Sequence, residues 1–591
     1  MCPLARRVAL AIVLAPVAVI HACWATPPGE EMANLLRRYQ TDRSDLQRFY
    51  NIRLSGQRSE RLQRFSREWL DRLQGIAFDN LDADSRIDYL LLRNHLEGEL
   101  RGLTHALERR EEILPLLPFA STIIDLEESR WRTLSIDSRE VAERLAKLAE
   151  AIDGLREAEA KRLKKTDEDA EAPIKPTVAR RAARSLSRLR STLREWFQNQ
   201  DGYQPEFSWW VKSPYEEAGK ALERYADFLM KKVAGIKGED DDPLIGDPIG
   251  REALIDALTE EMIPYGPEEM LEIARREFAW CEERMLEASR ELGLGEDWRA
   301  ALEQVKELHQ PPGKQVELVA RQAREAIAFL DERDLVTIPE LCRDTWRFSM
   351  ISERGQKTLP FAAYGGQRMM VAYPTQGMTH ESKRMSMRGN NIHFSRIVTP
   401  HELVPGHHLQ RFVAARHNTH RSAFGTPFLV EGWALYWELL LWKLGYPRGP
   451  EDRIGMLFWR MHRCARIIVS LKFHLAEMTP DEMIDFLVDR VGHERDGATS
   501  EVRRYIGGGY GPLYQCAYMV GGLQLMALRG ELVESGRMTD RQFHDAVLRE
   551  GSIPIELIRA RLLGIALERD HSTGWKFAGE VPPRKRRIER F

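Results

Sequence analysis

The chain has 591 residues, of which 43% are hydrophobic and 30% are charged. This length allows a large hydrophobic core or more than one lobe, and the composition is that of an ordinary soluble protein. The formal net charge is only −3, and charges of both signs are spread along the chain. This balance argues against nucleic acid or an anionic membrane surface as the main partner.

Residues 1–25 have the pattern of a secretory signal peptide. Two arginines precede an apolar run from Val8 to Ile20, and small residues follow it. Such a run is too short to span a bilayer comfortably, and no later run approaches transmembrane length. We therefore expect a periplasmic or extracellular protein with no integral membrane span. Cleavage can fall after Ala25, or Cys23 can become a lipidated N-terminus.

Most of the remaining sequence predicts helix, because apolar residues recur at intervals of three and four among charged ones. The clearest stretches are 35–73, 141–163, 178–196, 215–234 and 267–294. Charge-rich breaks at 163–176 and 238–248 separate some of them. Three aspartates in the second break permit a calcium site, but no EF-hand spacing follows and a polar surface loop is preferred. We expect an N-terminal helical part over 26–245 and a second part over 246–591.

The region from 360 to 399 is the exception to helix. Residues 368–373 and 391–398 look like short strands, bounded by glycine and proline. A small sheet is therefore predicted immediately before the histidine-rich segment that follows. An extended peptide can pair with the exposed edge of such a sheet.

The segment 401–408 reads His-Glu-Leu-Val-Pro-Gly-His-His. On a regular helix, His401 and His407 would point about 120° apart and could not bind one ion. Pro405 has no N–H to donate to the preceding turn, and Gly406 tolerates unusual backbone angles. We predict that these two residues form a bulge that returns His407 to the face of His401.

Two imidazoles and a carboxylate can hold zinc with one position open. His401 and His407 are the expected histidine ligands, with His408 as the alternative to His407. Glu431 begins a helical run that can present it as the third ligand. Glu438 lies two turns further along the same face, where it can orient a ligand histidine or form a surface salt bridge.

The remaining catalytic candidates surround this centre. Glu402, next to the first histidine, is the expected general base and then proton donor. A glycine-rich turn leads into a helix with tyrosines four residues apart. Tyr518 and Tyr514 can stabilise an oxyanion, with Tyr510 a weaker candidate and core packing the alternative for each. The arginine pair at 503–504 can clamp a substrate carboxylate.

At these residues the chain resembles the bacterial family catalogued as domain of unknown function 885. That family carries an HExxPGHHLQ motif, matched at 401–410, and an EGWALY motif, matched at 431–436. A later arginine-tyrosine pair and a proline-led turn ending in tyrosine match residues 504–505 and 512–518. The resemblance covers nearly the whole mature chain, so that one family domain can span 26–591.

More distantly, the chain is similar to helical zinc peptidases related to thimet oligopeptidase and angiotensin-converting enzyme. They share a downstream glutamate ligand and a glycine-tyrosine turn. Their catalytic histidine before that turn is not matched, since Tyr505 stands near its place, and the histidine motif here is two residues longer. The resemblance implies a mainly α, two-lobed fold with a deep central cleft and a zinc-dependent peptidase activity.

The sequence therefore favours an exported zinc metallopeptidase that hydrolyses short peptides. One alternative is a zinc hydrolase of a non-peptide amide or ester. The other is a non-catalytic, peptide-binding export protein that keeps the motif as structure.

Overall fold

The computed structural model describes residues 28–164, 173–236, 244–366 and 368–581. Over these residues the protein is mainly helical with one small sheet, which confirms the predicted class. The leader, with Cys23, and the three aspartates of the 238–248 loop lie outside the described residues. Within the described residues, no helix combines the length and the apolar character needed to cross a membrane.

Helices occur at the stretches that showed helical periodicity. The 35–73 stretch is two helices, α1 (Pro28–Phe49) and α2 (Gly56–Gln74), separated by residues 50–55. The other stretches correspond to α5 (Ser138–Arg162), α6 (Pro176–Gln198), α7 (Pro205–Phe228) and α9 (Pro267–Glu291). The side chain of Ser55 caps α2 by accepting the N–H of Arg58, and Asp137 caps α5 in the same way. Ser and Asp at these positions satisfy N–H groups that have no partner within the helix.

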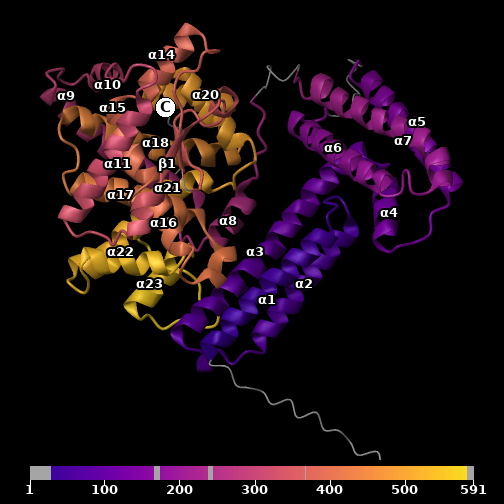
Figure 1. Cartoon of the computed structure of the whole chain (residues 1–591), viewed down its shortest axis with the longest axis horizontal. Helices are drawn as coiled ribbons and strands as arrows, with labels where there is room; N and C mark the ends of the chain where they lie inside the picture. The colour runs from indigo at the N-terminus through magenta and orange to yellow at the C-terminus, as the bar shows by residue number, and fades with distance from the viewer. Residues whose placement is uncertain (1–27, 165–172, 237–243, 367, 582–591) are drawn as a thin grey trace, which may run out of the picture.

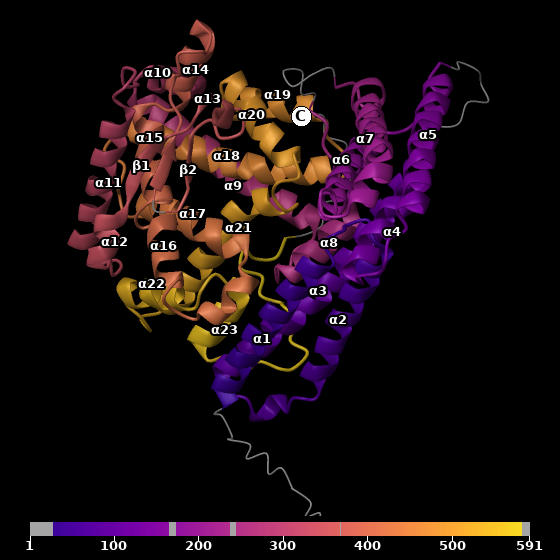
Figure 2. The same cartoon turned by 45° about the vertical axis from the view of Figure 1, so that its right-hand side comes forward.

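The N-terminal helices form two groups (Figure 1). Three of them lie side by side, and the longest, α3, leads to a second group at its far end (Figure 2). The first group is α1 (Pro28–Phe49), α2 (Gly56–Gln74) and α3 (Ala83–Ile113). The second is α4 (Ala120–Trp131), α5 (Ser138–Arg162), α6 (Pro176–Gln198) and α7 (Pro205–Phe228).

The body of the protein follows in the chain and contains the histidine motif. Its helices before that motif are α8 (Arg251–Glu260), α9 (Pro267–Glu291), α10 (Trp298–Lys306), α11 (Gln315–Glu332), α12 (Glu340–Thr345), α13 (Glu353–Gln356) and α14 (His380–Gly389). Those that carry the motif or follow it are α15 (Ile392–Glu402), α16 (His407–Ala414), α17 (Pro427–Lys443), α18 (Pro450–His474), α19 (Pro480–Phe486), α20 (Arg495–Ile506), α21 (Tyr514–Arg529), α22 (Asp540–Arg549) and α23 (Ile555–Leu563).

The hydrophobic core does not divide at residue 245. The larger core joins buried residues of 32–96 to those of 254–581, whereas the smaller one is built mainly from residues 113–229. Helices α1–α3 therefore belong to the same packed body as the histidine motif.

The sheet has three strands in the order β1-β3-β2 (β1, Arg347–Met350; β2, Ala362–Tyr364; β3, Arg368–Val371). β1 pairs with β3 in parallel and β2 pairs with β3 in antiparallel orientation. The strand predicted at 368–373 is confirmed over its first four residues. β2 is an edge strand of the sheet.

The strand predicted at 391–398 is wrong, because these residues begin helix α15. The Asn391 side chain caps that helix by accepting the N–H groups of His393 and Phe394. Every residue from Phe394 to Glu402 is buried, so the apolar residues are not confined to one face. Without one exposed face, a short apolar run has no periodicity that separates strand from helix.

Candidate metal centre

The histidine motif is broken between its two helices, as the sequence predicted. α15 ends at Glu402 and α16 begins at His407. In the bulge between them, the N–H of Gly406 donates to the carbonyl of Pro400 at 2.9 Å, and that of His408 donates to Leu403 at 3.0 Å. The bonded residues are six and five positions apart in the sequence, instead of the four of an α-helix. The extra residues are absorbed, and the two helices can share one site.

Gly406 has the unusual backbone angles that the sequence predicted, and it is also closely packed. Its φ is −74° and its ψ is −133°, a pair outside the α and β regions. A Cβ at this position would overlap the carbonyl oxygen of His401. The indole Nε1 of Trp433 donates to the carbonyl of Pro405 at 2.8 Å. The tryptophan of the EGWALY motif therefore fixes the bulge.

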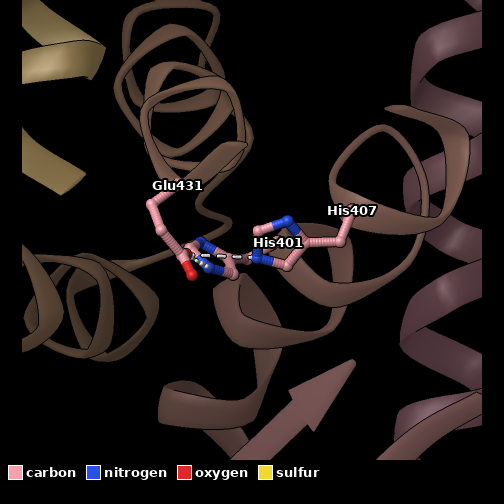
Figure 3. A group of neighbouring side chains, drawn as sticks. All are labelled: His401, His407 and Glu431. Atoms are coloured by element: carbon pink, nitrogen blue, oxygen red, sulfur yellow. Dashed lines mark ion pairs between the residues drawn. The ribbon is translucent and has the colours of Figure 1, made fainter. Parts of the chain in front are cut away.

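His401, His407 and Glu431 converge on one buried point (Figure 3). Their potential ligand atoms all lie within 4.8 Å of one another. Oε2 of Glu431 is 3.2 Å from Nε2 of His407 and 3.7 Å from Nε2 of His401. Zinc bonds of about 2.0–2.2 Å in a tetrahedron place neighbouring ligand atoms roughly 3.4 Å apart. The three side chains thus have the separation that a zinc site requires.

The third member of this triad is placed by close contact between α17 and α21. A Cβ at Gly432 would lie 2.6 Å from the Cα of Gly521, and one at Gly521 would overlap the carbonyl oxygen of Phe428. Paired glycines let the two backbones meet directly. Glu431, adjacent to this contact, is thereby fixed between the histidines and the tyrosines of α21.

The neighbouring histidine has a different environment. His408 is bonded through Nδ1 to the hydroxyl of Tyr364 at 3.1 Å and through Nε2 to the carbonyl of Cys342 at 2.9 Å. Both of its ring nitrogens are therefore occupied by protein groups. The structure brings His407, and not His408, to the triad.

Glu438 contacts the triad through Nδ1 of His401, on the side of the ring away from Glu431. Its Oε1 lies 2.7 Å from Nδ1 of His401 and accepts from Nη2 of Arg463 at 3.3 Å. A hydrogen bond at Nδ1 leaves Nε2 of His401 available as a metal ligand. Glu438 is buried and is both histidine-bonded and salt-bridged, so the two roles considered for it coexist, without surface exposure.

The pKa values of His401 and Glu431 are strongly shifted in opposite directions. Burial lowers the pKa of His401, but the neighbouring carboxylates of Glu431 and Glu438 outweigh burial and raise the pKa to about 9. Burial also raises the pKa of Glu431, yet its interactions with the imidazoles of His407 and His401 hold it well below its ordinary value. Oε2 of Glu431 is buried and has no hydrogen-bond partner among the described residues. A metal cation bound between the two histidines and Glu431 would replace the proton that His401 carries.

The triad opens into a cavity of about 850 Å³. Glu402 lines it, as do Tyr514, Tyr518 and the edge strand β2. The predicted base, both preferred tyrosines and the strand edge are thus gathered at one cavity.

The two tyrosines have different partners. The hydroxyl of Tyr514 donates to Oε1 of Glu431. The hydroxyl of Tyr518 accepts from Nη2 of Arg504 at 3.1 Å, and its ring lies 6.2 Å from that of His401 at an interplanar angle of 14°. Burial raises the pKa of both phenols, so both are protonated at neutral pH. Tyr514 is engaged with a member of the triad, whereas the proton of Tyr518 remains available to a ligand.

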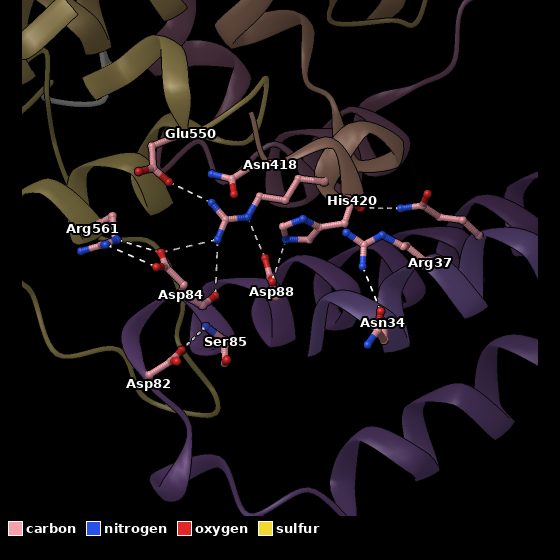
Figure 4. A network of polar contacts seen from close by, with 12 residues as sticks. Asn34, Arg37, Asp82, Asp84, Ser85, Asp88, Asn418, His420, Glu550 and Arg561 are labelled. Atoms are coloured by element: carbon pink, nitrogen blue, oxygen red, sulfur yellow. Dashed lines mark hydrogen bonds and ion pairs between the residues drawn. The ribbon is translucent and has the colours of Figure 1, made fainter. Parts of the chain in front are cut away.

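The N-terminal helices support the cavity from outside through the residues that precede α17. Arg421, 2% exposed, lines the cavity and donates to Asp88 of α3 at 2.7 Å and to Glu550 at 2.8 Å. His420 also contacts Asp88, at 3.0 Å (Figure 4). A buried network of this kind fixes the position of its members when it is satisfied. Helix α3 therefore braces the cavity.

Sequence reasoning missed one group of residues at this site. Arg463 and Arg466 of α18 line the cavity, beside the Arg504 that had been considered. They lie three residues apart in a 25-residue helix with several other basic residues, and nothing in that pattern marks which of them face inward. The arginine pair itself divides, because Arg503 donates to the carbonyl of Lys357 at 3.3 Å and does not line this cavity.

The fold and the site define a mainly helical protein with a buried cluster of two histidines and one glutamate. The chain belongs to the family described as "Bacterial protein of unknown function (DUF885)", whose model matches residues 48–562. A search of curated proteins finds no match.

Two solved structures share the fold. One is "a putative lipoprotein of unknown function" from Shewanella oneidensis, with a TM-score of 0.65 and 17% identity, covering 91% of this chain and 100% of that one. The other is "the putative lipoprotein" from Colwellia psychrerythraea, with a TM-score of 0.56 and 16% identity, covering 91% and 99%. At these identities the likeness concerns the fold alone.

Proposed function

We propose that this protein is an exported, zinc-dependent metallopeptidase that hydrolyses short peptides. The observation that carries the proposal is the convergence of His401, His407 and Glu431 at the cavity that Glu402 lines. Two imidazoles and one carboxylate, with room beside them, are the donor set of a catalytic zinc site.

The triad suits zinc in donor chemistry and in spacing. His401, His407 and Glu431 would hold the ion, and Glu438 would orient His401 from behind. A zinc ion held there would act as a Lewis acid, polarising a carbonyl and acidifying water. Calcium and magnesium prefer oxygen ligands, which makes them a poor match for two imidazoles.

The remaining steps belong to residues of the chain. Glu402 would accept a proton from the attacking water and later deliver it to the amine that leaves. Tyr518 would donate a hydrogen bond to the oxyanion that forms on the scissile carbonyl, because its oxygen already accepts from Arg504 and its proton is free. Tyr514 would position Glu431 through its hydrogen bond.

A peptide substrate is favoured by the edge strand at the cavity. β2 pairs on one side only, and Ala362 and Tyr364 line the cavity. Backbone groups of an edge strand can pair with an extended peptide. A cavity of about 850 Å³ is in the size range of sites for small ligands, which favours short peptides over folded proteins. The two-lobed cleft and the likeness to thimet oligopeptidase and angiotensin-converting enzyme are parts of the same proposal.

Export is supported by the leader pattern of residues 1–25. Both structural neighbours are described as putative lipoproteins, which is compatible with a lipid anchor. We infer that the mature protein is periplasmic or extracellular, and that Cys23 is the residue to test for lipidation.

Metal analysis combined with one substitution tests the activity. Purified protein is expected to contain one zinc per chain and to hydrolyse a library of short peptides, with loss on chelation and recovery on adding zinc. Glu402→Gln is expected to keep zinc but to lose about 10²–10⁴-fold in activity. Hydrolysis of small amides or esters but of no peptide would favour the first alternative. Protein without stoichiometric zinc, unaffected by Glu402→Gln, would favour a non-catalytic binding protein.

A further inference from the structure

Three of the arginines that line the cavity form a cluster beside the candidate metal centre. Arg463 and Arg466 come from α18 and Arg504 comes from α20. Arg463 is 5% exposed and Arg466 is 2% exposed, and the side chain of Arg504 is 11% exposed. Arginine is almost never buried to this degree unless its charge and its N–H groups are matched.

The match within the protein is incomplete. Arg463 pairs with Glu438 at 3.3 Å, and both Arg466 and Arg504 pair with Glu501, at 2.6 and 3.7 Å. In the described part of the chain, two carboxylates therefore pair with these three guanidinium groups. The surplus is one positive charge. Glu402 and Glu431 do not remove it, because together they would balance the two charges of a zinc ion.

The hydrogen bonds show the same deficit. Nε of Arg463, Nη1 of Arg466 and Nε of Arg504 are buried and have no hydrogen-bond partner in the described part of the chain. A buried, unpaired donor on a charged group is costly. All three donors belong to arginines that line one cavity, where a bound ligand can supply an acceptor.

The cluster lies one aromatic ring away from the metal centre. The guanidinium carbons of Arg463 and Arg466 are 4.7 and 4.5 Å from the centre of the Tyr518 ring, which in turn stacks with His401. Glu438 also connects the two groups, because it contacts His401 and Arg463 through the same oxygen. A ligand at the arginines would therefore lie close to the reacting bond.

We propose that Arg463, Arg466 and Arg504 bind the C-terminal carboxylate of a peptide substrate, an inference that rests on the proposed peptidase function. A carboxylate carries the single negative charge that the cluster lacks, and guanidinium groups bind it through paired N–H donors. An extended residue spans about 3.3–3.6 Å, so a carboxylate bound next to Tyr518 belongs to the first or second residue after the scissile bond. The enzyme therefore acts from the C-terminus, releasing one or two residues.

The test compares an N-acetylated tripeptide having a free C-terminal carboxylate with the same peptide as its C-terminal amide. Both are titrated calorimetrically into the full-length, zinc-loaded Glu402→Gln protein, which binds without turnover. The acid is expected to bind about 10- to 100-fold more tightly than the amide, the range for hydrogen bonds to a charged group.

Two variants assign this preference to the cluster. Arg504→Gln changes its most exposed member, and Arg466→Lys keeps the charge beside Glu501 while removing the planar fork. Each is expected to reduce the acid-to-amide ratio at least fivefold at an unchanged Tm. The matched control is Arg460→Gln, also on α18, whose arginine pairs with Glu277 at 2.7 Å away from the cavity lining. It is expected to leave the ratio unchanged.

The outcomes separate this inference from the proposed function. Equal binding of acid and amide, or binding of neither, overturns the carboxylate site. So does a ratio that the Arg504 and Arg466 variants leave intact. If the unsubstituted enzyme cleaves acid and amide peptides equally well, the peptidase stands and the carboxylate site fails. A preserved acid preference without zinc-dependent hydrolysis supports the site as a peptide-binding one and removes the proposed peptidase function.

Discussion

The two walls of the cavity differ in which polar groups lack a hydrogen-bond partner among the described residues: an acceptor on one wall and donors on the other. On the histidine wall, formed by α15, α16 and α17, a buried carboxylate oxygen of Glu431 has no hydrogen-bond partner within the described ranges. On the arginine wall, formed by α18 and α20, three N–H groups have none among the residues described. The proposed zinc ion would supply a cation to the acceptor beside the imidazoles, and the proposed substrate carboxylate would supply an anion to the guanidinium donors. The two proposals therefore assign ligands of opposite charge to the two walls.

The walls are joined by shared residues. Glu438 contacts His401 on one side and Arg463 on the other, and the ring of Tyr518 lies between His401 and the arginines. Substitutions in the two walls and in the residues that join them should therefore have separable effects, and the following predictions use this.

The largest effect is expected from the histidine wall. His407→Ala removes one of three protein ligands and should abolish stoichiometric zinc. His408→Ala is the matched control, because both ring nitrogens of His408 are bonded to protein groups, and it should retain zinc. The measurement is metal content after dialysis. Loss of zinc from the His408 variant alone would mean that the ligand assignment is reversed.

The next effect concerns the close contact between α17 and α21 beside Glu431. Gly521→Ala should destabilise the protein by about 3 kcal/mol, because its Cβ would overlap the backbone of α17, which cannot give way cheaply. Gly219→Ala on α7 is the control, since its Cβ would meet nothing within 4 Å. It should leave stability unchanged or raise it by up to about 1 kcal/mol. Denaturant unfolding measures both, and equal effects would contradict the close contact.

Sequence could predict the histidine wall because its candidate ligands lie in two short motifs. The two-residue excess between His401 and His407, with a proline and a glycine inside it, was enough to predict the bulge. Periodicity was enough for long amphipathic helices such as α5 and α9. It failed at 391–398, where burial on every side removes the pattern that separates helix from strand.

The arginine wall could not be predicted in the same way. Its members lie on two helices, and several other arginines on the same helices point elsewhere. Which of them face the cavity depends on how α18 packs against α9, α15 and α21. That information is tertiary, so residue type and spacing do not contain it. The need for glycine at position 432 is also a tertiary effect, because it arises from the close approach of Gly521 on α21.

Substitution of Glu438, which contacts both walls, should have an intermediate effect. Glu438→Gln keeps an acceptor for His401 but removes the charge that makes the imidazole a stronger ligand. Zinc affinity should fall about 10- to 100-fold, the usual effect of losing such an outer partner. Competition with a chelator of known affinity measures it. Glu277→Gln breaks a comparable arginine pair on another face and should leave zinc affinity unchanged. Equal affinities in both variants would separate Glu438 from the metal centre.

The smallest effect comes from the bond that holds the bulge. Trp433→Phe removes the N–H that donates to the carbonyl of Pro405, while much of the ring's packing remains. The matched control is Trp437→Phe on the same helix, because the Nε1 of Trp437 is buried with no hydrogen-bond partner among the described residues.

Both substitutions lose similar ring area, so the difference between them isolates the hydrogen bond. Trp433→Phe should cost about 1 kcal/mol more in the free energy of unfolding, since a net buried hydrogen bond contributes about 0.5–1.5 kcal/mol. It should also weaken zinc binding, because a looser bulge holds His407 less firmly against His401. If zinc affinity is unchanged while stability falls, Trp433 stabilises the fold without positioning the ligand, and packing around His407 alone maintains the histidine wall.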